Sequence, residues 1–362
     1  MKIGIDAKWY FNGHPSGKVV VENLVNQLVN IDSFNEYYIY LDKRNKNLTF
    51  PYANKNVHLI YIPNRINAIT NFFVLPFYTF RNKLDVCVYQ NYAPFWGAKK
   101  RVNYVHDALF MDFPEYFSVK ERMYFWPMKY LSRFANHVIT ISNSEKERMV
   151  KHGFSKKENI SFVHHGIGLA NDDSAKFKDE NGLKQYQLPE NFILYLGRLN
   201  VRKNIQTLLK AMPKIDKDLS LVIVGKDDHK TVDLDKLINN LNLSKRVIRL
   251  GFVSIEDITS IYKKASVFCF PSFAEGFGLP PLEAMYYGTP TVVSNTTSLP
   301  EICNDASLYV DPNKEDEIAT QVNKLLNDKR LREDIIEKGK RRAASFSWEK
   351  AAKEILTIIK SI

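Results

Sequence analysis

Short runs of apolar residues alternate with segments of helical periodicity along the whole chain. In the first half we expect seven strands, at residues 2–6, 37–41, 57–62, 86–90, 102–106, 138–142 and 160–163. In the second half we expect six, at residues 193–196, 219–224, 247–250, 267–270, 291–294 and 308–310. Helical patterns fall between them, for example at residues 18–29 and 119–135. This alternation predicts an α/β fold built from parallel, doubly wound sheets.

A polar stretch without clear periodicity, residues 166–190, divides the pattern into two halves. A chain of 362 residues is also long enough for two domains. We therefore expect a Rossmann-like domain at residues 1–165, a linker, and a second Rossmann-like domain at residues 191–347. The last segment, residues 348–362, has the pattern of an amphipathic helix, which either completes the second domain or packs back on the first. In such an arrangement the carboxyl ends of both sheets face a central cleft, where ligands bind.

Composition excludes several classes of protein. With 45% hydrophobic and 13% aromatic residues, each half can bury a core, which excludes a largely disordered chain. There is no run of about 18 apolar residues, so we expect no membrane-spanning helix. The three cysteines, at positions 87, 269 and 303, form no C-x-x-C pair. This excludes a disulfide scaffold and a thiolate zinc site and favours a reducing, cytoplasmic location.

The net charge of +11 is unevenly distributed. Residues 1–165 contain 22 basic and 13 acidic side chains, whereas residues 166–362 are nearly neutral. A basic half favours an anionic partner, which is a nucleic acid, a membrane surface or an acidic substrate. The alternative is a lysine-rich surface that is simply solvated.

Two aromatic stretches in the basic half, residues 72–80 and 123–128, are flanked by cations. These cations are Arg65, Arg81, Lys83, Lys120, Arg122, Lys129 and Arg133. Three interpretations remain open: a membrane interface with anionic lipid, core helices with solvated ends, or aromatic walls that stack on an acceptor sugar.

The clearest candidate site lies at residues 270–285, where a strand is followed by a glycine-containing loop and a helix opened by two prolines. Glu275 lies in the loop, and we expect Glu283 in the first helical turn. The loop amides and the helix N-terminus suit an anion, and each carboxylate can accept two hydrogen bonds from a vicinal diol. Together they fit a sugar–diphosphate–ribose ligand. The alternative is a glycine turn in which a glutamate favours the helix dipole.

A second candidate site lies at residues 195–204, where a strand runs into Gly197 and a loop carries three cations. The guanidinium groups of Arg198 and Arg202 are planar and can form paired hydrogen bonds, and the ammonium of Lys203 is a compact charge. Together these groups suit the two phosphates of a diphosphate. The alternative is a set of solvated side chains, although cations at a helix start are disfavoured by the helix dipole.

In this order and about 70 residues apart, the two motifs resemble those of the retaining glycosyltransferases of family 4 (glycosyl transferases group 1), including bacterial mannosyltransferases of surface-polysaccharide assembly. The resemblance covers most of the chain and is strongest at residues 193–302. Its elements are E-x7-E, G-R-x4-K-N, and the segments at residues 251–253, 288–293 and 299–301. It implies the GT-B fold, with two Rossmann-like domains.

The resemblance also implies roles for individual residues. Arg198 and Lys203 would hold the donor diphosphate, Glu275 would bind the donor sugar, and Glu283 the ribose. The backbone around Val253 would meet the nucleobase. The remaining donor-binding residues implied in this half are Gly197, Gly276, Phe277, Gly278 and Leu279.

In the first half, Gly17 and His106 are the implied site residues. Gly17 would let the loop after the first strand approach phosphate and acceptor, although this loop departs from the family's double-glycine form. His106, in a His-Asp pair with Asp107, would contact the donor sugar and support the transition state. The alternative for this pair is a structural hydrogen bond. We interpret Ser142 as a helix N-cap, and the alternative is a role in the cleft for Ser142 or Ser144.

The implied reaction retains the anomeric configuration through front-face attack, and the leaving phosphate oxygen takes the acceptor proton. It requires no cofactor and no metal, and we interpret the two D-x-D stretches, at residues 216–218 and 233–235, as a turn and a helix start.

We expect transfer from GDP-mannose, or next from a UDP-sugar, to a glycan or lipid-linked acceptor in surface-polysaccharide or lipopolysaccharide biosynthesis. A peripheral location on the inner face of the cytoplasmic membrane would suit the basic half.

Two other functions remain open. A nucleotide-sugar epimerase can share the GT-B fold, and it would place further acid–base residues near the donor. A basic nucleic-acid-binding protein would explain the charge, but the sequence contains no recognition motif for it.

Overall fold

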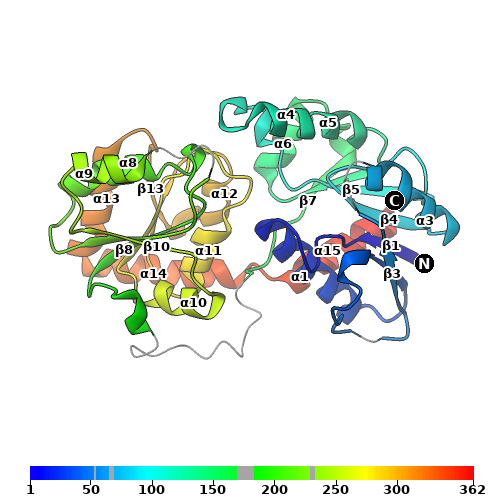
Figure 1. The fold of residues 1–362 in the computed structure, drawn as a ribbon, viewed down its shortest axis with the longest axis horizontal. Coiled ribbons are helices and arrows are strands. Elements are labelled where there is room, and N and C mark those ends of the chain that lie inside the picture. Colours follow the sequence, from blue (N-terminus) through cyan, green and yellow to red (C-terminus); the bar gives the residue numbers. More distant parts are fainter. Residues whose placement is uncertain (53, 65–68, 169–182, 229–232) are drawn as a thin grey trace. The chain divides into compact units, whose positions relative to one another are not determined.

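The computed structural model describes all residues except 53, 65–68, 169–182 and 229–232. Arg65 and most of the expected linker therefore lie outside the described residues. The chain divides into two compact units, Met1–Gly168 with Phe346–Ile362, and Leu169–Ser345 (Figure 1). Residues 183–190 belong to the second unit, in which the Tyr186 hydroxyl donates a hydrogen bond to Asp257 Oδ2 at 2.7 Å.

The first unit contains a parallel sheet of seven strands in the order β3-β2-β1-β4-β5-β6-β7. The strands are β1 (Lys2–Asp6), β2 (Glu36–Asp42), β3 (Val57–Ile62), β4 (Val86–Gln90), β5 (Lys100–Tyr104), β6 (His137–Thr140) and β7 (Ile160–Phe162). The order changes direction next to β1, as expected for a doubly wound sheet, and ligands commonly bind at such a switch point.

Helices connect these strands. They are α1 (Pro15–Ile31), α3 (Leu75–Arg81), α4 (Val119–Phe125), α5 (Pro127–Ser132), α6 (Asn143–Lys151) and the C-terminal α15 (Trp348–Ser361). The single helix predicted over residues 119–135 is wrong, because α4 ends at Phe125 and α5 begins at Pro127. Proline has no backbone N–H to donate back to the preceding turn, so the helix is interrupted there.

Helix α15 belongs to the first unit and packs on α1 (Figure 1). Its apolar face is buried, and the Trp348 ring stacks on His165 with centroids 5.2 Å apart. A Cβ atom at Gly166 would lie 2.2 Å from the Trp348 backbone nitrogen, so only glycine permits this approach. The amphipathic C-terminal segment therefore packs back on the first unit.

The second unit contains a parallel sheet of six strands in the order β10-β9-β8-β11-β12-β13. They are β8 (Phe192–Leu196), β9 (Ser220–Val224), β10 (Val247–Gly251), β11 (Val267–Phe270), β12 (Thr291–Ser294) and β13 (Leu308–Val310). The helices are α8 (Ile205–Ala211), α9 (Leu234–Asn240), α10 (Ile255–Lys264), α11 (Leu279–Tyr286), α12 (Leu299–Cys303), α13 (Glu315–Asn327) and α14 (Lys329–Ala344). Figure 1 shows α8, α9 and α13 on one face of the sheet and α10, α11 and α14 on the other.

The expected α/β class with two parallel, Rossmann-like sheets is confirmed. Buried apolar side chains from the sheet and both helix layers form the core of each unit. Ser142 caps α6, as predicted, because its hydroxyl accepts the Glu145 N–H at 3.2 Å.

Candidate functional site

The two candidate motifs of the second unit meet at the carboxyl edge of its sheet. The loop at residues 197–204 follows β8, and the loop at residues 271–278 follows β11, the neighbouring strand. The Phe273 N–H donates to the Arg202 carbonyl at 2.8 Å, and the Ser272 hydroxyl oxygen lies 3.1 Å from the same carbonyl oxygen. Strand order thus joins two motifs that are about 70 residues apart in sequence.

Glu275 lies at the centre of this contact and is 6% exposed. Its Oε1 accepts hydrogen bonds from Lys203 Nζ at 2.6 Å and from the Ser272 hydroxyl at 2.5 Å. Arg202 reaches Oε2 at 3.4 Å. The Glu275 N–H donates to Thr297 Oγ1 at 2.9 Å, so both backbone and side chain are fixed.

The charges in this cluster depend on one another. Burial alone would raise the pKa of Glu275, but Lys203 and Arg202 hold it below its ordinary value. Burial lowers the pKa of Lys203 to about 8, against the attraction of Glu275. At neutral pH both groups are therefore charged. A buried pair with an ammonium of perturbed pKa at a strand edge is typical of functional sites.

Arg198 lies apart from this cluster. Its side chain is about half exposed, and its guanidinium lies 3.7 Å from Asp228 Oδ2. Arg202, which the basic loop suggested as a diphosphate ligand but to which the family resemblance gave no role, occupies the inner position and also donates to the Ala274 carbonyl. The signal for it was present, since Arg202 precedes Lys203 in the same basic loop.

The glycine loop has the expected position but differs in one detail. Gly276 and Phe277 are buried, and Gly278 is the N-cap of α11 with φ +114°, a conformation that favours glycine. Leu279 begins the helix. Glu283 is its fifth residue and lies in the second turn, so its predicted place in the first turn is wrong.

Glu283 is half-buried and accepts a hydrogen bond from the Tyr262 hydroxyl at 3.1 Å. Burial raises its pKa to about 7. Its environment therefore differs from that of Glu275, which has two cations close by.

Gly197 follows β8 and Val253 follows β10, two strands of the same sheet that are separated by β9. The Gly197 N–H donates to the Val224 carbonyl at 3.0 Å, and Val253 is buried. Gly225, which we did not predict, approaches Gly197 so closely that a Cβ atom would lie 1.9 Å from the Gly197 oxygen. Gly225 could have been identified from the sequence, because it is a glycine directly after a buried strand.

In the first unit, His106 lies beyond the end of β5. Its Nε2 is 2.9 Å from Gln90 Oε1, and its backbone N–H donates to Asn91 Oδ1 at 3.2 Å. Burial lowers its pKa to about 4, so the ring is neutral at physiological pH. Asp107 accepts the Leu109 N–H at 3.3 Å, which is a local turn contact.

Gly17 is the third residue of α1, and the structure places it near His106 through a tryptophan that we did not predict. A Cβ atom at Gly17 would lie 2.9 Å from Trp9 Cε3. The Trp9 and His106 ring centroids are 5.5 Å apart. Trp9 therefore links the two candidate residues of this unit.

A buried ion pair lies at the end of β1. Lys8 Nζ is 2.6 Å from both carboxylate oxygens of Asp6 and 2.7 Å from Asn71 Oδ1. The Gln90 N–H donates to Asp6 Oδ2 at 3.4 Å. These contacts join the end of β1 to the strand that carries the partner of His106, and the sequence pattern did not predict them.

Glu145 is fully buried and fixes the segment after His106. Its Oε2 accepts the Ala108 N–H at 2.8 Å, and its Oε1 pairs with Arg148. Arg148 also contacts Asp112 Oδ2 at 2.8 Å. Burial raises the pKa of Glu145 to about 8.

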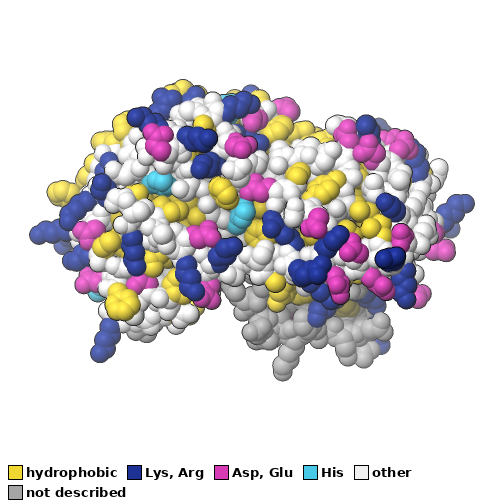
Figure 2. Space-filling model, turned by 180° about the vertical axis from the view of Figure 1, so that it is seen from behind, with side chains coloured by type: hydrophobic (Ala, Val, Ile, Leu, Met, Phe, Trp, Pro, Cys, Tyr) yellow, Lys and Arg dark blue, Asp and Glu magenta, His cyan; other side chains and the backbone are white. Residues whose placement is uncertain are grey.

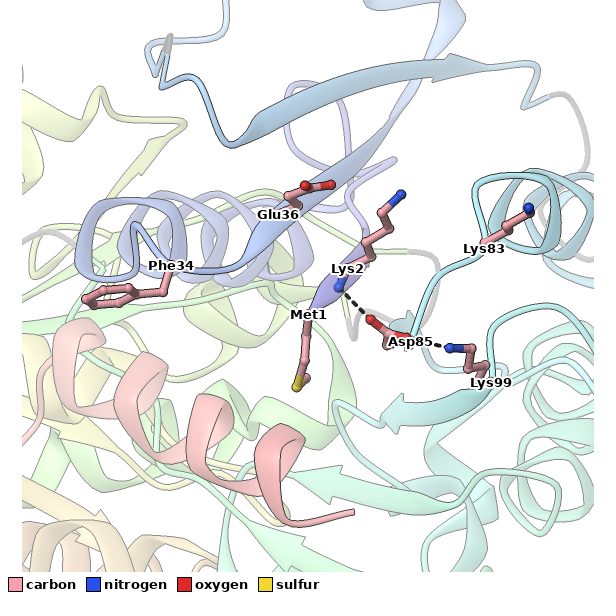
Figure 3. A pocket seen from close by; sticks show the side chains of 7 residues that line it. All are labelled: Met1, Lys2, Phe34, Glu36, Lys83, Asp85 and Lys99. Carbon is pink, nitrogen blue, oxygen red and sulfur yellow. Dashed lines mark hydrogen bonds and ion pairs between the residues drawn. The ribbon is translucent and has the colours of Figure 1, made fainter.

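An open surface pocket of the first unit lies elsewhere. It has a volume of about 430 Å³ and is seen in Figure 3. Its lining residues are Met1, Lys2, Phe34, Glu36, Lys83, Asp85 and Lys99. These residues lie at or near the amino ends of the strands, whereas His106 follows a carboxyl end, so the pocket belongs to the opposite edge of the sheet.

Within the described ranges, no group of three or more His, Cys, Asp or Glu side chains is arranged to hold a metal ion. Residues 216–218 form the expected turn, and Asp233 caps α9. None of the helices described here is long and apolar enough to cross a membrane.

The chain matches two family models that together span most of its length. Residues 18–171 match the model described as Glycosyltransferase Family 4, and residues 178–342 match the model described as Glycosyl transferases group 1. An uncharacterized glycosyltransferase of Methanocaldococcus jannaschii is 34% identical over 246 residues, which are 64% of this chain and 62% of the relative. The O-antigen chain mannosyltransferase B of Escherichia coli is 37% identical over 183 residues, which are 49% of this chain and 48% of the relative. The matched stretches thus span about half to three fifths of these two relatives.

Solved structures of similar fold cover nearly the whole chain. Sucrose-phosphate synthase from Thermosynechococcus elongatus superposes with a TM-score of 0.76 at 21% identity, covering 100% of this chain and 98% of that one. Anabaena HepE in complex with UDP and glucose superposes with a TM-score of 0.72 at 18% identity and full coverage of both chains. At these identities the likeness shows the fold, which is GT-B. From both family models and the two Rossmann-like sheets, the chain belongs to the glycosyltransferases of group 1, with a family 4 N-terminal half.

Proposed function

We propose that this chain is a retaining, metal-independent glycosyltransferase that transfers a sugar from a nucleotide-diphosphate donor to a glycan or lipid-linked acceptor in surface-polysaccharide biosynthesis. The observation that carries the proposal is the contact between Lys203 and Glu275. It joins a basic loop suited to a diphosphate to a carboxylate suited to sugar hydroxyls, at a strand edge where nucleotides commonly bind.

In this proposal the second unit binds the donor. Lys203 and Arg198 pair with the diphosphate, Glu275 orients sugar hydroxyls, and the amides of residues 276–279 lie beside the transferred group. Glu283 meets the ribose, and the backbone near Val253 meets the nucleobase. Arg202 holds the opposite side of the Glu275 carboxylate, which limits the orientations that this group can adopt.

GDP-mannose is the first donor we propose. It is supported by relatives named as O-antigen mannosyltransferases, those of Escherichia coli and of Salmonella typhimurium. A UDP-sugar is the alternative, supported by the solved relative that binds UDP and glucose. The relatives' names also favour an acceptor that belongs to a surface polysaccharide.

For the reaction we propose front-face attack with retention. The leaving phosphate oxygen takes the acceptor proton, while fixed cations and loop amides stabilise the negative charge that develops on the diphosphate. Lys203 is the best-placed cation, because its partners already orient it. His106, being neutral, acts as a hydrogen-bonding group toward the sugar and not as a cation.

A thermal-shift panel tests the donor assignment, because a ligand that binds the native state raises the melting temperature. The panel contains GDP-mannose, GDP, GMP, UDP-glucose, UDP and UMP, each with and without EDTA. We expect diphosphates of one base to stabilise the protein more than the monophosphate, and EDTA to have no effect. Equal shifts for di- and monophosphates would contradict the diphosphate site, and loss of binding with EDTA would contradict metal independence.

A further inference from the structure

A helical segment of the first unit has its apolar stripe on the outside. Residues Thr70–Val74 form a π-helical turn that runs directly into α3. The stripe has helical spacing, so its members share one face. It consists of Ile69, Phe73, Phe77 and Phe80, which are 50–66% exposed.

The opposite face of the same segment is buried and includes polar residues. Thr70, Asn71 and Thr79 are each at most 2% exposed. Asn71 accepts a hydrogen bond from Lys8, and the Thr79 hydroxyl donates to the Pro76 carbonyl at 2.9 Å. Leu75, which also lies on this side, is fully buried in a core cluster, so the segment is apolar on both faces, whereas a surface helix of a soluble protein normally has a polar outer face. The aromatic face is therefore turned outward by specific buried contacts on the other side.

A second exposed stripe runs along α4 and α5. It consists of Val119, Met123, Trp126 and Tyr130, which also repeat at helical spacing and are 39–71% exposed. No residue of α4 itself is buried. Phe125 is the partly buried residue of this helix that packs against the core, and the stripe faces away from it.

The two stripes are connected through the loop after β4. The Phe80 and Trp96 ring centroids are 6.5 Å apart, and those of Phe95 and Phe134 are also 6.5 Å apart. Tyr130 lies one helical turn before Phe134, which continues the second stripe. Among the described residues, eleven of the seventeen exposed large hydrophobic side chains fall between residues 69 and 134. A concentration of this kind marks an interaction surface.

Cations accompany these aromatic residues. Lys129 Nζ lies 5.6 Å and the Arg133 guanidinium 5.4 Å from the Tyr130 ring centroid. Arg81, Lys83, Lys120 and Arg122 are exposed beside the stripes. On the face seen in Figure 2, hydrophobic and basic side chains are likewise interspersed over the surface of the first unit.

We infer that these two stripes form the surface by which the first unit docks on an anionic lipid bilayer. Aromatic side chains at the headgroup level, with cations beside them, are the combination that binds such an interface. The excess of cations selects an anionic bilayer over a neutral one. These side chains are solvent-exposed and contribute little to the packing of the core. Contact with lipid would explain why large apolar side chains occupy these surface positions. The inference rests on the proposed function in one respect, because a lipid-linked acceptor would reach the enzyme at this surface.

Cosedimentation with vesicles tests the inference, using phosphatidylcholine alone and phosphatidylcholine mixed with phosphatidylglycerol at low salt. We expect the full chain to bind the anionic vesicles and the Phe77→Ser/Trp126→Ser variant to bind them about tenfold more weakly. The control is Phe34→Ser, which removes a phenylalanine of the same unit that lies outside the stripes and is more exposed than Phe77 or Trp126, and this variant should bind normally. A Lys129→Glu/Arg133→Glu variant should lose the preference for anionic lipid.

Two further measurements keep the outcomes distinct. Melting temperatures should be unchanged in the stripe variants, since the replaced side chains are exposed, and the nucleotide-induced shift should persist, which separates this inference from the donor assignment. Failure of the wild-type chain to bind anionic vesicles, or equal binding by the stripe and Phe34→Ser variants, would overturn the proposal. So would a wild-type dimer that the stripe variant converts to a monomer without any vesicle binding, because the surface would then join two copies.

Discussion

Lys203 Nζ lies 2.6 Å from Glu275 Oε1, so one buried ion pair joins the basic loop after β8 to the glycine loop after β11. Ser272 of the glycine loop also contacts Glu275 Oε1, but the cations that balance the carboxylate come from the other loop. Arg202 contacts the second oxygen of the same carboxylate, which makes the cluster two cations around one anion. Removing the anion leaves two buried positive charges, and removing Lys203 still leaves one pairing. This asymmetry makes Glu275 the most sensitive position in the cluster.

The first prediction concerns Glu275→Gln. We expect it to reduce the free energy of unfolding by about 3 kcal/mol, because it leaves Lys203 and Arg202 buried without their counterion. Transfer activity should fall about 100-fold if the carboxylate orients the donor sugar. Urea unfolding and initial rates measure the two effects. Asp228→Asn is the control: it removes the carboxylate that pairs with Arg198, in a solvent-accessible ion pair whose side chains are 49% and 29% exposed, and it should change stability by less than about 1 kcal/mol. Equal effects of the two variants would contradict the central place of Glu275.

The second prediction concerns the pH dependence of donor binding. Burial lowers the pKa of Lys203 to about 8, and only its protonated form attracts a phosphate. Affinity for the nucleoside diphosphate should therefore be constant below this pH and fall as pH rises above it, by at most roughly tenfold per pH unit. Calorimetry from neutral to alkaline pH measures the change. In Lys203→Arg the charge persists throughout, so a dependence as steep as in the wild type would exclude Lys203 as its source.

Sequence patterns predicted the strands closely because parallel buried strands are nearly continuous apolar runs. The strands at residues 57–62, 267–270 and 291–294 are confirmed to the residue. The break at Pro127 was missed because periodicity continues across it, even though a proline interrupts the hydrogen bonds. Apolar periodicity also shows which residues share a helix face, but not which face is buried. The outward stripe of Phe73, Phe77 and Phe80 could therefore be seen only in the structure.

The candidate site was predicted in part. Lys203 and Glu275 were both selected from sequence, but their direct contact depends on β8 and β11 being neighbours, which no local pattern specifies. The same holds for the contact between Gln90, at the end of β4, and His106, just beyond the adjacent strand β5, and for the position of Trp9. Residue type alone does not show which of Arg198 and Arg202 contacts Glu275, because both are arginines of the same basic loop. The fold of that loop places Arg202 next to the carboxylate.

The third prediction concerns the protonation of His106. Its pKa is lowered by burial to about 4, so the ring should not titrate between about pH 5 and 8. In Gln90→Glu a carboxylate replaces the amide that lies 2.9 Å from Nε2, and this should raise the pKa of His106 above about 6. Proton NMR of the imidazole signals measures both values, with His106→Gln to assign the resonance. A pKa near 6.5 in the wild-type protein would show that the ring is solvated and its predicted neutrality wrong.

The fourth prediction compares two glycines that follow neighbouring strands, Gly225 after β9 and Gly251 at the end of β10. Both have positive φ, +144° and +66° respectively, so alanine is strained at either position. A Cβ atom at Gly225 would lie 1.9 Å from the Gly197 oxygen, whereas at Gly251 nothing lies within 4 Å. Gly251→Ala should thus lower the free energy of unfolding by about 1 kcal/mol, the backbone contribution alone. Gly225→Ala should lower it by about 3 kcal/mol, because the backbone at Gly197 must also move.

That movement would be transmitted to the loop that carries Lys203, since Gly197 is the first residue of this loop. Gly225→Ala should accordingly weaken nucleoside diphosphate binding, while Gly251→Ala should leave the contribution of Lys203 intact. Urea unfolding and calorimetric titration of both variants measure the two effects side by side. If the variants lost equal stability and bound the nucleotide equally well, the close approach of Gly225 to Gly197 would have no part in shaping the donor site.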